Sequence, residues 1–354
     1  MIIIDGSHGE GGGQMLRTSL SMSALTGRPF RMEHIRAGRK KPGLRYQHLT
    51  AVLAVADLCQ AEVRGAAVNS QFLEFVPQAR PTAGKYTWDV TDVAPNGSAG
   101  AIMLIWQTVL WPLLFASGAN SQITLRGGTH VSFSPSFHYI QNVFVPSLRH
   151  FGVSIQPDLI DWGWYPLGGG QIQTQIRPIS HLEAADFLPE PINSVNGLAV
   201  VTNLPGHIPH RMSRRAHNLL TEQGWHAAVQ ALRLKSNSTG AGLFLWLPSN
   251  QAGVTSLGSR GLPAQTVAER AVDELIEFAE SGAAVDPHLA DQLLIPMALA
   301  HGTSSYTTNQ LTQHTLTNID ILQKWLDADI SYTGSLNQPA EISVTGIGYS
   351  APTS

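Results

Sequence analysis

The sequence predicts an α/β protein made of three similar units packed together, with a smaller α/β domain inserted into it. Its 354 residues exceed what one hydrophobic core usually serves. Three pairs of helix-like patterns recur along the chain, each pair accompanied by short strand-like runs, as in a repeat architecture. Residues 183–282 interrupt this order with helices and strands of their own between polar, turn-rich stretches.

The composition fits a folded protein with a large core. Hydrophobic residues make up 43% of the chain and charged residues 13%, which excludes a disordered chain. The formal net charge is -3, so contact with nucleic acid requires a local basic patch. Cys59 is the only cysteine, which excludes an intrachain disulfide framework and a cysteine-built metal site. A lone cysteine suits a reducing compartment, and we expect a cytoplasmic location.

The regular elements follow from hydrophobic periodicity. Residues 2–5 are strand-like, and no basic region precedes them as in a signal peptide. A second strand is expected at residues 122–125. The three expected helix pairs are 14–25 with 47–59, 98–116 with 136–151, and 289–300 with 315–326.

The stretch 99–116 is apolar enough to require a membrane test. Gln107 and Thr108 lie in its middle, Pro112 interrupts it, and no basic flank follows. These features favour a buried core helix over a membrane span, and no membrane partner is expected.

The inserted segment has its own pattern. Helices are expected at 211–223 and 264–281, and strands at 198–202 and 243–247. We therefore expect a main domain of residues 1–182 plus 283–354 and an inserted domain of residues 183–282.

A glycine-rich loop, Gly6–Gly13, joins the first strand to the first helix. Successive glycines allow backbone N–H groups to approach an anion, and the helix N-terminus adds partial positive charge. The loop lacks the Gly-Lys-Ser/Thr of a Walker motif and the dinucleotide spacing, so a tight turn is the alternative. Glu10 favours an anion site, because a carboxylate beside an anion requires a cation between them.

A basic run follows at residues 36–45, with five cations in ten positions. Arginine grips phosphate oxygens with two parallel hydrogen bonds. A solvated basic loop is the common alternative. The run lies just before a helix start at Gln47, where anions bind, so a phosphate site is favoured.

Two further motifs open helices near the C-terminal end. Asp291 lies in the run His288–Gln292, where a carboxylate could simply complement the helix dipole. His314 opens the last helix, and a neutral imidazole is a competent nucleophile toward phosphorus. A cap or surface role is the alternative, and these arguments alone do not select His314 among fourteen histidines.

Together these motifs resemble the RNA 3′-terminal phosphate cyclase family. The matching stretches occur in family order over nearly the whole chain outside the insert; they are residues 9–17, 35–49, 127–129, 165–170, 289–300 and 314–319.

The resemblance implies three βαβαββ-type units with an inserted α/β domain. It also implies ATP and a divalent metal, Mg²⁺ or Mn²⁺, as cofactors, and RNA ending in a 3′-phosphate as the partner. A histidine would attack the α-phosphorus of ATP and then pass AMP to the RNA 3′-phosphate. The neighbouring 2′-hydroxyl would finally displace AMP and close a 2′,3′-cyclic phosphate.

The resemblance also assigns residues. His314 would be the nucleophile, Glu10 the metal ligand, and Asp291 the neighbour of histidine and nucleotide. The adenosine pocket would be lined by Gln107, His288, Leu289, Ala290, Asp291 and Gln292. The phosphates would be held by Arg17, Arg36, Arg39 and Gln47, with Gln14 in the same pocket.

The chain departs from the family pattern at three histidines. His288 stands where an aromatic residue is common, which bears on adenine stacking. His130 and His138 stand where Asn or Asp and an acidic residue are usual, which bears on nucleotide preference and RNA contacts.

Three rival functions remain. They are a non-catalytic branch of the same superfamily that acts in ribosome assembly, an RNA-end-binding protein without turnover, and an enzyme resembling the enolpyruvyl transferases. The first lacks the nucleophile, whereas this chain retains His314 with Glu10, Asp291 and the arginines. The last shares repeated α/β units but does not explain the His314 motif.

Overall fold

A computed structural model describes residues 1–94, 97–249 and 251–351. The first unit is a four-stranded sheet with two helices. Its sheet has the strand order β1-β2-β4-β3, with β1 and β2 parallel and the other pairs antiparallel. Its elements are β1 (Ile2–Asp5), α1 (Gln14–Thr26), β2 (Phe30–Glu33), α2 (Tyr46–Cys59), β3 (Glu62–Arg64) and β4 (Leu73–Val76).

The second unit repeats this topology, with the strand order β5-β6-β8-β7. Its second helical segment, expected as one helix at 136–151, changes pitch: a wide π turn precedes Pro146, which has no N–H to donate. The elements are β5 (Lys85–Asp89), η1 (Val90–Val93), α3 (Ile102–Leu114), β6 (Ser121–Gly127), α4 (Phe137–Tyr139), η2 (Ile140–Phe144), α5 (Val145–Leu148), η3 (Arg149–Phe151), β7 (Gln156–Asp161) and β8 (Gly170–Ile176).

The third unit has the same order, β9-β14-β16-β15, again with one parallel and two antiparallel pairs. The prediction of three repeated βαβαββ units is therefore confirmed. Its elements are β9 (Asp186–Phe187), α8 (Pro287–Leu299), β14 (Thr303–Thr308), α9 (Gln313–Trp325), β15 (Asp329–Tyr332) and β16 (Ala340–Thr345).

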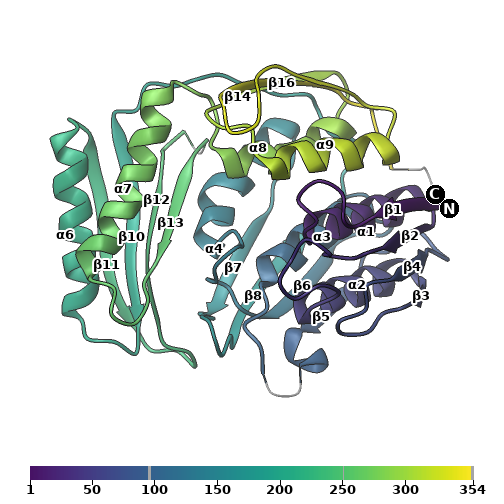
Figure 1. Ribbon diagram of the computed structural model, residues 1–354, viewed down its shortest axis with the longest axis horizontal. Coiled ribbons are helices and arrows are strands. Elements are labelled where there is room, and N and C mark those ends of the chain that lie inside the picture. Colours follow the sequence, from purple (N-terminus) through teal and green to yellow (C-terminus); the bar gives the residue numbers. More distant parts are fainter. Residues whose placement is uncertain (95–96, 250, 352–354) are drawn as a thin grey trace.

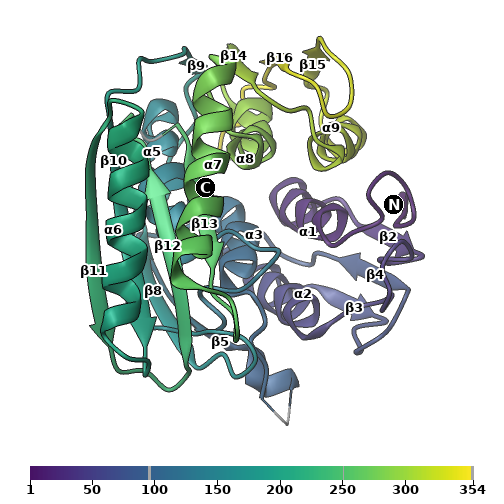
Figure 2. The same cartoon turned by 60° about the vertical axis from the view of Figure 1, so that its left-hand side comes forward.

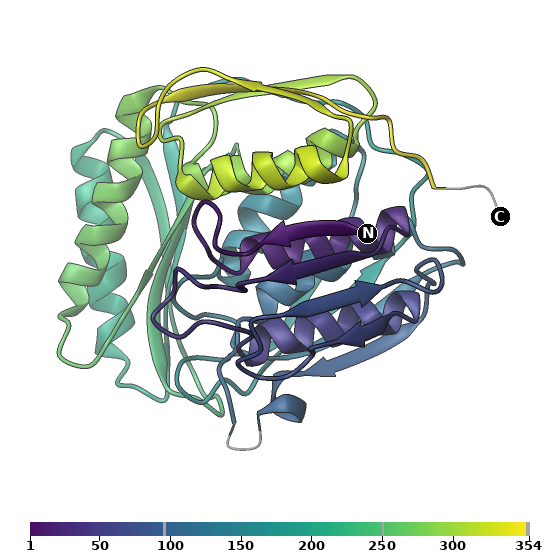
Figure 3. The same cartoon turned by 45° about the vertical axis from the view of Figure 1, so that its right-hand side comes forward.

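The helices of the three units pack on one another, with their sheets outside (Figures 1 and 3). Every residue of α3 except Gln107 is buried, so the apolar stretch forms a core helix as predicted. One continuous hydrophobic cluster spans the three units and includes Trp106, Trp111 and Trp325. Among the described residues, no helix combines the length and hydropathy that a membrane crossing needs.

A fourth sheet, ordered β11-β10-β12-β13, lies between β9 and α8 in the chain. One of its faces is covered by two helices, which build a second hydrophobic core (Figure 2). Its elements are β10 (Ser194–Thr202), α6 (His207–Glu222), β11 (His226–Leu234), β12 (Gly240–Trp246), β13 (Gly253–Leu257) and α7 (Ala264–Ser281).

The domain division at residues 183 and 282 stays a prediction. Because β9 pairs in parallel with β14, residues 186–187 belong to the sheet of the third unit. We propose that the inserted domain begins after Phe187 and ends before α8.

The other face of the fourth sheet packs on the second unit through aromatic side chains. Phe244 of β12 clusters there with Trp164, and His130 stacks on Trp162 with 4.4 Å between ring centroids. His130 Nε2 lies 2.9 Å from His138 Nδ1, and both rings are buried. These two departures from the family pattern therefore pack inside the protein, between the second unit and the inserted sheet.

The buried histidine pair predicts a pH-dependent stability. Burial lowers the pKa of His138 from 6.5 to about 4 and that of His130 well below 6.5. Because the unfolded chain binds more protons below pH 6.5, stability is complete above that pH and falls toward pH 4. The loss from His138 alone is about 3 kcal/mol.

Thermal denaturation across this pH range tests the prediction. His138→Gln keeps a hydrogen-bonding group beside His130 but does not titrate, so its melting temperature should fall less steeply with acid than that of the wild type. Equal slopes in the two proteins would contradict it.

Candidate active site

The glycine-rich loop of residues 6–13 packs against the first turns of α9. Gly9 has φ +58°, and a Cβ there would collide with Oγ1 of Thr317. The Glu10 N–H donates to Thr317 Oγ1 at 3.1 Å, and that hydroxyl donates to the Gln313 carbonyl at 2.7 Å. Glycine is thus required at position 9, where the loop meets the helix.

His314 is the second residue of α9, whose N-terminus is capped by the Thr312 side chain. Its side chain is about half exposed, at 48%. Its Nδ1 lies 2.8 Å from Oε1 of Gln14, the first residue of α1, and 3.0 Å from Oε2 of Glu10. The structure therefore brings three of the predicted site residues together from two units.

Asp291 of α8 completes this group. Its carboxylate forms a side-chain hydrogen bond with Gln14. Its carbonyl accepts from Asn318 Nδ2 at 3.1 Å, and Asn318 Oδ1 accepts from Thr18 Oγ1 at 2.9 Å. Side chains thus join α1, α8 and α9 at two places.

The amide of Gln14 fixes the protonation of His314. A carboxylate only accepts hydrogen bonds, so the NH₂ of Gln14 faces Asp291 and its oxygen faces the imidazole. Nδ1 of His314 then carries the proton, and the lone pair lies on Nε2. The arrangement presents one defined nucleophilic nitrogen.

The charges of the site favour a neutral imidazole. Burial lowers the pKa of His314; the Asp291 carboxylate opposes this shift, and Arg17 and Arg39 add to it. Burial also raises the pKa of Asp291, whereas His314, His288 and Arg17 lower it. His314 is therefore unprotonated at neutral pH and able to act as a nucleophile.

The predicted phosphate ligands differ in their surroundings. Burial lowers the pKa of Arg17 to about 10, and no hydrogen-bond acceptor meets its guanidinium among the described residues. Arg39 forms an ion pair with Glu10. Arg36 donates at 2.9 Å to the carbonyls of Lys41 and Gly43, so it shapes the basic loop. Of these three, Arg17 has its hydrogen-bonding capacity free for an anion.

The side chain of Gln47 forms a hydrogen bond within the protein. Its Oε1 accepts from the Ala101 N–H at 2.9 Å, where α2 meets the start of α3. Its side-chain oxygen is thus committed to the packing of two helices.

His48 was not singled out from the sequence, yet it lies at the centre of the arginine cluster. Its ring is 5% exposed, and Nδ1 accepts from the Arg45 N–H at 3.2 Å, so Nε2 carries a proton. A Cβ on Gly13 would collide with that nitrogen and lie 2.9 Å from Arg17 Nη1. Burial is the main cause that holds the pKa of His48 well below 6.5, and Arg17 and three other arginines add to this effect. The sequence signal was its place in the first turn of a helix behind a basic run.

A cavity of about 60 Å³ lies beside His314 and is lined by Arg17, Gln14, Gln107, Asp291 and Gln292, among others. Gln107 Nε2 donates to Gln292 Oε1 at 2.6 Å. This volume is well below the roughly 300–1,000 Å³ of a typical ligand pocket, so binding of a small molecule requires these side chains to move.

The remaining residues predicted to line the adenosine pocket differ in how deeply they are buried. Leu289 and Ala290 are fully buried in the main core. His288 is exposed at the start of α8, with its ring 6.3 Å from that of Tyr139. Any ligand contact by these side chains therefore comes from His288, Asp291 and Gln292.

Glu10 is the residue predicted to hold a metal ion. Among the residues described, no group of three or more His, Cys, Asp or Glu side chains could hold a metal ion. The Nδ1 proton of His314 is directed at Gln14, and the buried Oε2 of Glu10 has no hydrogen-bond partner. Such an oxygen fits a cation bound by one carboxylate and completed by ligand phosphates.

The repeated units and this site define an α/β protein in which a half-exposed histidine lies beside carboxylates and arginines. Residues 8–332 match the family described as RNA 3′-terminal phosphate cyclase. The chain belongs to this family.

Its relatives are similar over most of their length. The RNA 3′-terminal phosphate cyclase of Nostoc punctiforme is 50% identical, over 92% of this chain and 94% of the relative. The RNA 3′-terminal phosphate cyclase of Methylococcus capsulatus is 46% identical, over 92% of this chain and 91% of the relative. That of Pyrobaculum aerophilum is 39% identical, over 98% of both chains. The enolpyruvyl transferase NikO of Streptomyces tendae aligns with 98% of this chain and 49% of its own at a TM-score of 0.39 and 11% identity, too low to support an inference.

The contact between the glycine loop and α9 gives a test. Gly9→Ala combines positive φ with a collision at Thr317, whereas Gly27→Ala has a similar φ of +68° and open space. Gly9→Ala should therefore lower the free energy of unfolding by about 1–3 kcal/mol more than Gly27→Ala. Urea denaturation of both variants measures the difference, and equal losses would show that the loop does not press on the helix.

Proposed function

We propose that this protein converts the 3′-terminal phosphate of RNA into a 2′,3′-cyclic phosphodiester at the expense of ATP, through AMP bound covalently to His314. The observation that carries the proposal is the hydrogen-bonded chain from Asp291 through Gln14 to His314 beside the arginine cluster. Membership of the cyclase family supports it.

The first step uses Nε2 of His314. This nitrogen attacks the α-phosphorus of ATP, the new P–N bond forms, and the bond from the α-phosphorus to the bridging oxygen breaks to release pyrophosphate. Nδ1 keeps its proton, which it donates in a hydrogen bond to Gln14 Oε1, and Asp291 stabilises the positive charge that develops on the ring. The reaction therefore requires no separate base for the nucleophile.

The second and third steps activate the RNA end. An oxygen of the RNA 3′-phosphate attacks the α-phosphorus, and the P–N bond breaks to leave neutral His314. The 2′-hydroxyl then attacks the terminal RNA phosphorus, its proton passes to solvent, and AMP leaves. A phosphate monoester becomes a usable electrophile once one oxygen carries this leaving group.

Phosphate binding is assigned to the hydrogen-bond donors around Gly13. Arg17 and the Nε2–H of His48 meet there, and Arg39 approaches from the basic loop. Preorganised donors of this kind stabilise charge as it develops on phosphate oxygens. Arg36 and Gln47 contribute by holding the loop and α2 in place.

Glu10 would hold a divalent ion, Mg²⁺ or Mn²⁺, through its buried Oε2, which accepts no hydrogen bond although it lies 3.0 Å from His314 Nδ1. When bound, the ion would neutralise charge on the nucleotide phosphates. In the described structure Glu10 pairs with Arg39, which occupies its other oxygen.

The cavity lined by Gln107 and Gln292 would receive the adenine base. The hydrogen bond between these two side chains opens, and their amides become available to the base. His288 is exposed in the first turn of α8, the helix that also carries Gln292, and would contact the nucleoside from the solvent side of the cavity.

A covalent-labelling experiment tests the nucleophile. Incubation with α-labelled ATP and a divalent metal should label the wild type with an acid-labile bond and leave His314→Ala unlabelled. Because the pKa of His314 lies below 6.5, the labelling rate should rise with pH below that value and then level off. Labelled His314→Ala would place the nucleophile elsewhere, and an unlabelled wild type would favour a protein that only binds RNA ends.

The role of Gln14 is tested by Gln14→Met, which keeps the length of the side chain but removes both hydrogen bonds. Loss of such an orienting partner lowers rates by about 10- to 100-fold. We expect this loss in the labelling rate at saturating ATP. The control, Gln107→Met, lines the same cavity without contacting His314 and should raise the KM for ATP instead. If the two variants had identical effects, Gln14 would have no specific role in orienting His314.

A further inference from the structure

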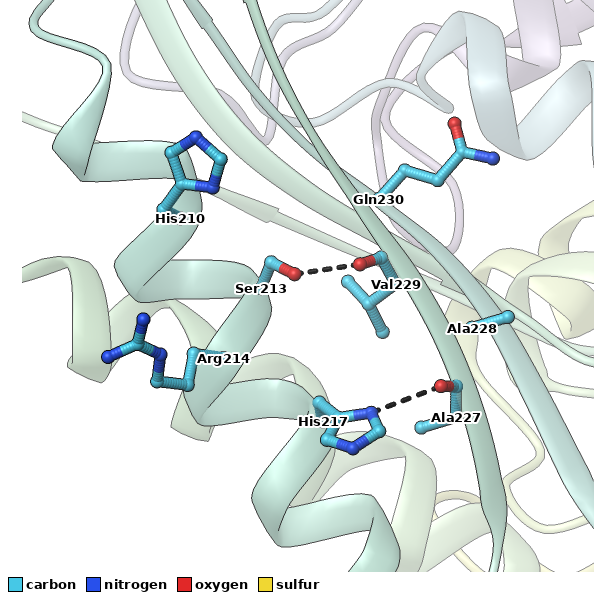
Figure 4. A pocket seen from close by; sticks show the side chains of 8 residues that line it. All are labelled: His210, Ser213, Arg214, His217, Ala227, Ala228, Val229 and Gln230. Carbon is cyan, nitrogen blue, oxygen red and sulfur yellow. Dashed lines mark hydrogen bonds between the residues drawn. The ribbon is translucent and has the colours of Figure 1, made fainter.

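A groove lies in the inserted domain. The helix α6 and the strand β11 of this domain lie at the opposite side of the molecule from β1 and β2 (Figure 1). It runs between α6 and the edge strand β11 and has a volume of about 450 Å³. Figure 4 shows its lining: His210, Ser213, Arg214 and His217 from the helix, and residues 227–230 from the strand. Among the residues that the structure describes, no acidic side chain lines this groove.

The helix carries a stripe of one arginine and three histidines, and three of these four side chains line the groove. His207, His210, Arg214 and His217 recur at intervals of three and four residues, which places them on one face of α6. All four are exposed. Arg214 forms no ion pair among the described residues, so its charge is available to a ligand.

The other cations of α6 are already occupied. Arg211 Nη2 donates to Gln265 Oε1 at 3.0 Å, and Arg215 forms an ion pair with Glu269 at 2.8 Å. Both partners lie on α7, which carries the acidic residues Glu269, Asp273, Glu274, Glu277 and Glu280. Apart from Glu222, the last residue of α6, the acidic side chains of the helix pair therefore lie on α7, and none of them lines the groove.

The strand β11, which forms one side of the groove, is not available for pairing with another strand. Although β11 is an edge strand, its Val229 carbonyl accepts from Ser213 Oγ at 2.7 Å, and its Ala227 carbonyl accepts from His217 Nδ1 at 3.1 Å. Covering edge carbonyls in this way prevents strand addition. The groove instead offers the Arg214 guanidinium and the His210 imidazole, which can donate to phosphate oxygens.

We propose that the groove between α6 and β11 binds the phosphodiester backbone of substrate RNA upstream of the 3′ end that reacts. The proposal rests on the proposed function for the identity of the polyanion. Because the groove lies at the opposite end of the inserted sheet from the glycine loop, only an RNA long enough to span both sites engages it.

The experiment compares Arg214→Gln with Arg211→Gln. Each variant removes one cation from α6, but only Arg214 lines the groove. Fluorescence anisotropy would measure the affinity of each protein for a long single-stranded RNA and for a trinucleotide, both ending in a 3′-phosphate, over a series of salt concentrations.

The wild type should bind the long RNA more tightly than the trinucleotide. Arg214→Gln should weaken binding of the long RNA by about fivefold and reduce the salt slope by about 0.7 for each phosphate that the variant no longer neutralises. Arg211→Gln should bind both RNAs as the wild type does. Circular dichroism spectra of both variants should match that of the wild type, since both side chains are exposed.

Three results would overturn the proposal: equal affinity of the wild type for both RNAs, unchanged binding in Arg214→Gln, or equal weakening by the two substitutions. The last would show that only net charge matters. Failure of the proposed function is a separate result, because it would appear as absence of cyclisation of the trinucleotide by the wild type.

Discussion

The site depends on one chain of hydrogen bonds, from Asp291 through Gln14 to His314. These side chains come from α8, α1 and α9, so the chain closes only when the first and third units are packed together. The Thr18–Asn318 contact and the close approach of Gly9 to Thr317 hold the same helices in register. The tautomer of His314 thus depends on the packing of helices that lie about 300 residues apart in sequence.

Two opposing effects set the electrostatics of this packing. Burial and the arginines disfavour protonation of His314, whereas Asp291 favours it. Burial is the larger effect, so the ring is neutral before a reaction and has a carboxylate nearby once it becomes positive. The same arginines surround His48 and keep that ring neutral, with its proton on the nitrogen that faces Gly13. A chain of net charge -3 in this way gathers positive charge at one place.

The sequence predicted the repeated units and the buried helix α3 well, because hydrophobic periodicity and apolar length are local properties. It also placed Glu10, Gln14, Asp291 and His314 in one site, through motifs that resemble a family. It could not distinguish Arg17, whose guanidinium is free, from Arg36, which bonds to the carbonyls of its own loop, because that difference arises from tertiary contacts. His48 was overlooked for the same reason, and Leu289 and Ala290 were grouped with exposed neighbours although helix geometry turns them into the core.

The inserted sheet is connected by hydrogen bonds to the start of α8, the helix that carries Asp291. The insertion falls directly before α8, and Asp286, which caps that helix, accepts a hydrogen bond from the Gly253 N–H of β13 at 3.0 Å. The same carboxylate accepts from the Tyr139 hydroxyl of the second unit at 2.9 Å. Three parts of the fold therefore meet at one buried side chain, little more than one helical turn before Asp291. This carboxylate therefore ties the inserted sheet to the helix that carries Asp291, so the insert and the site are connected through one buried side chain.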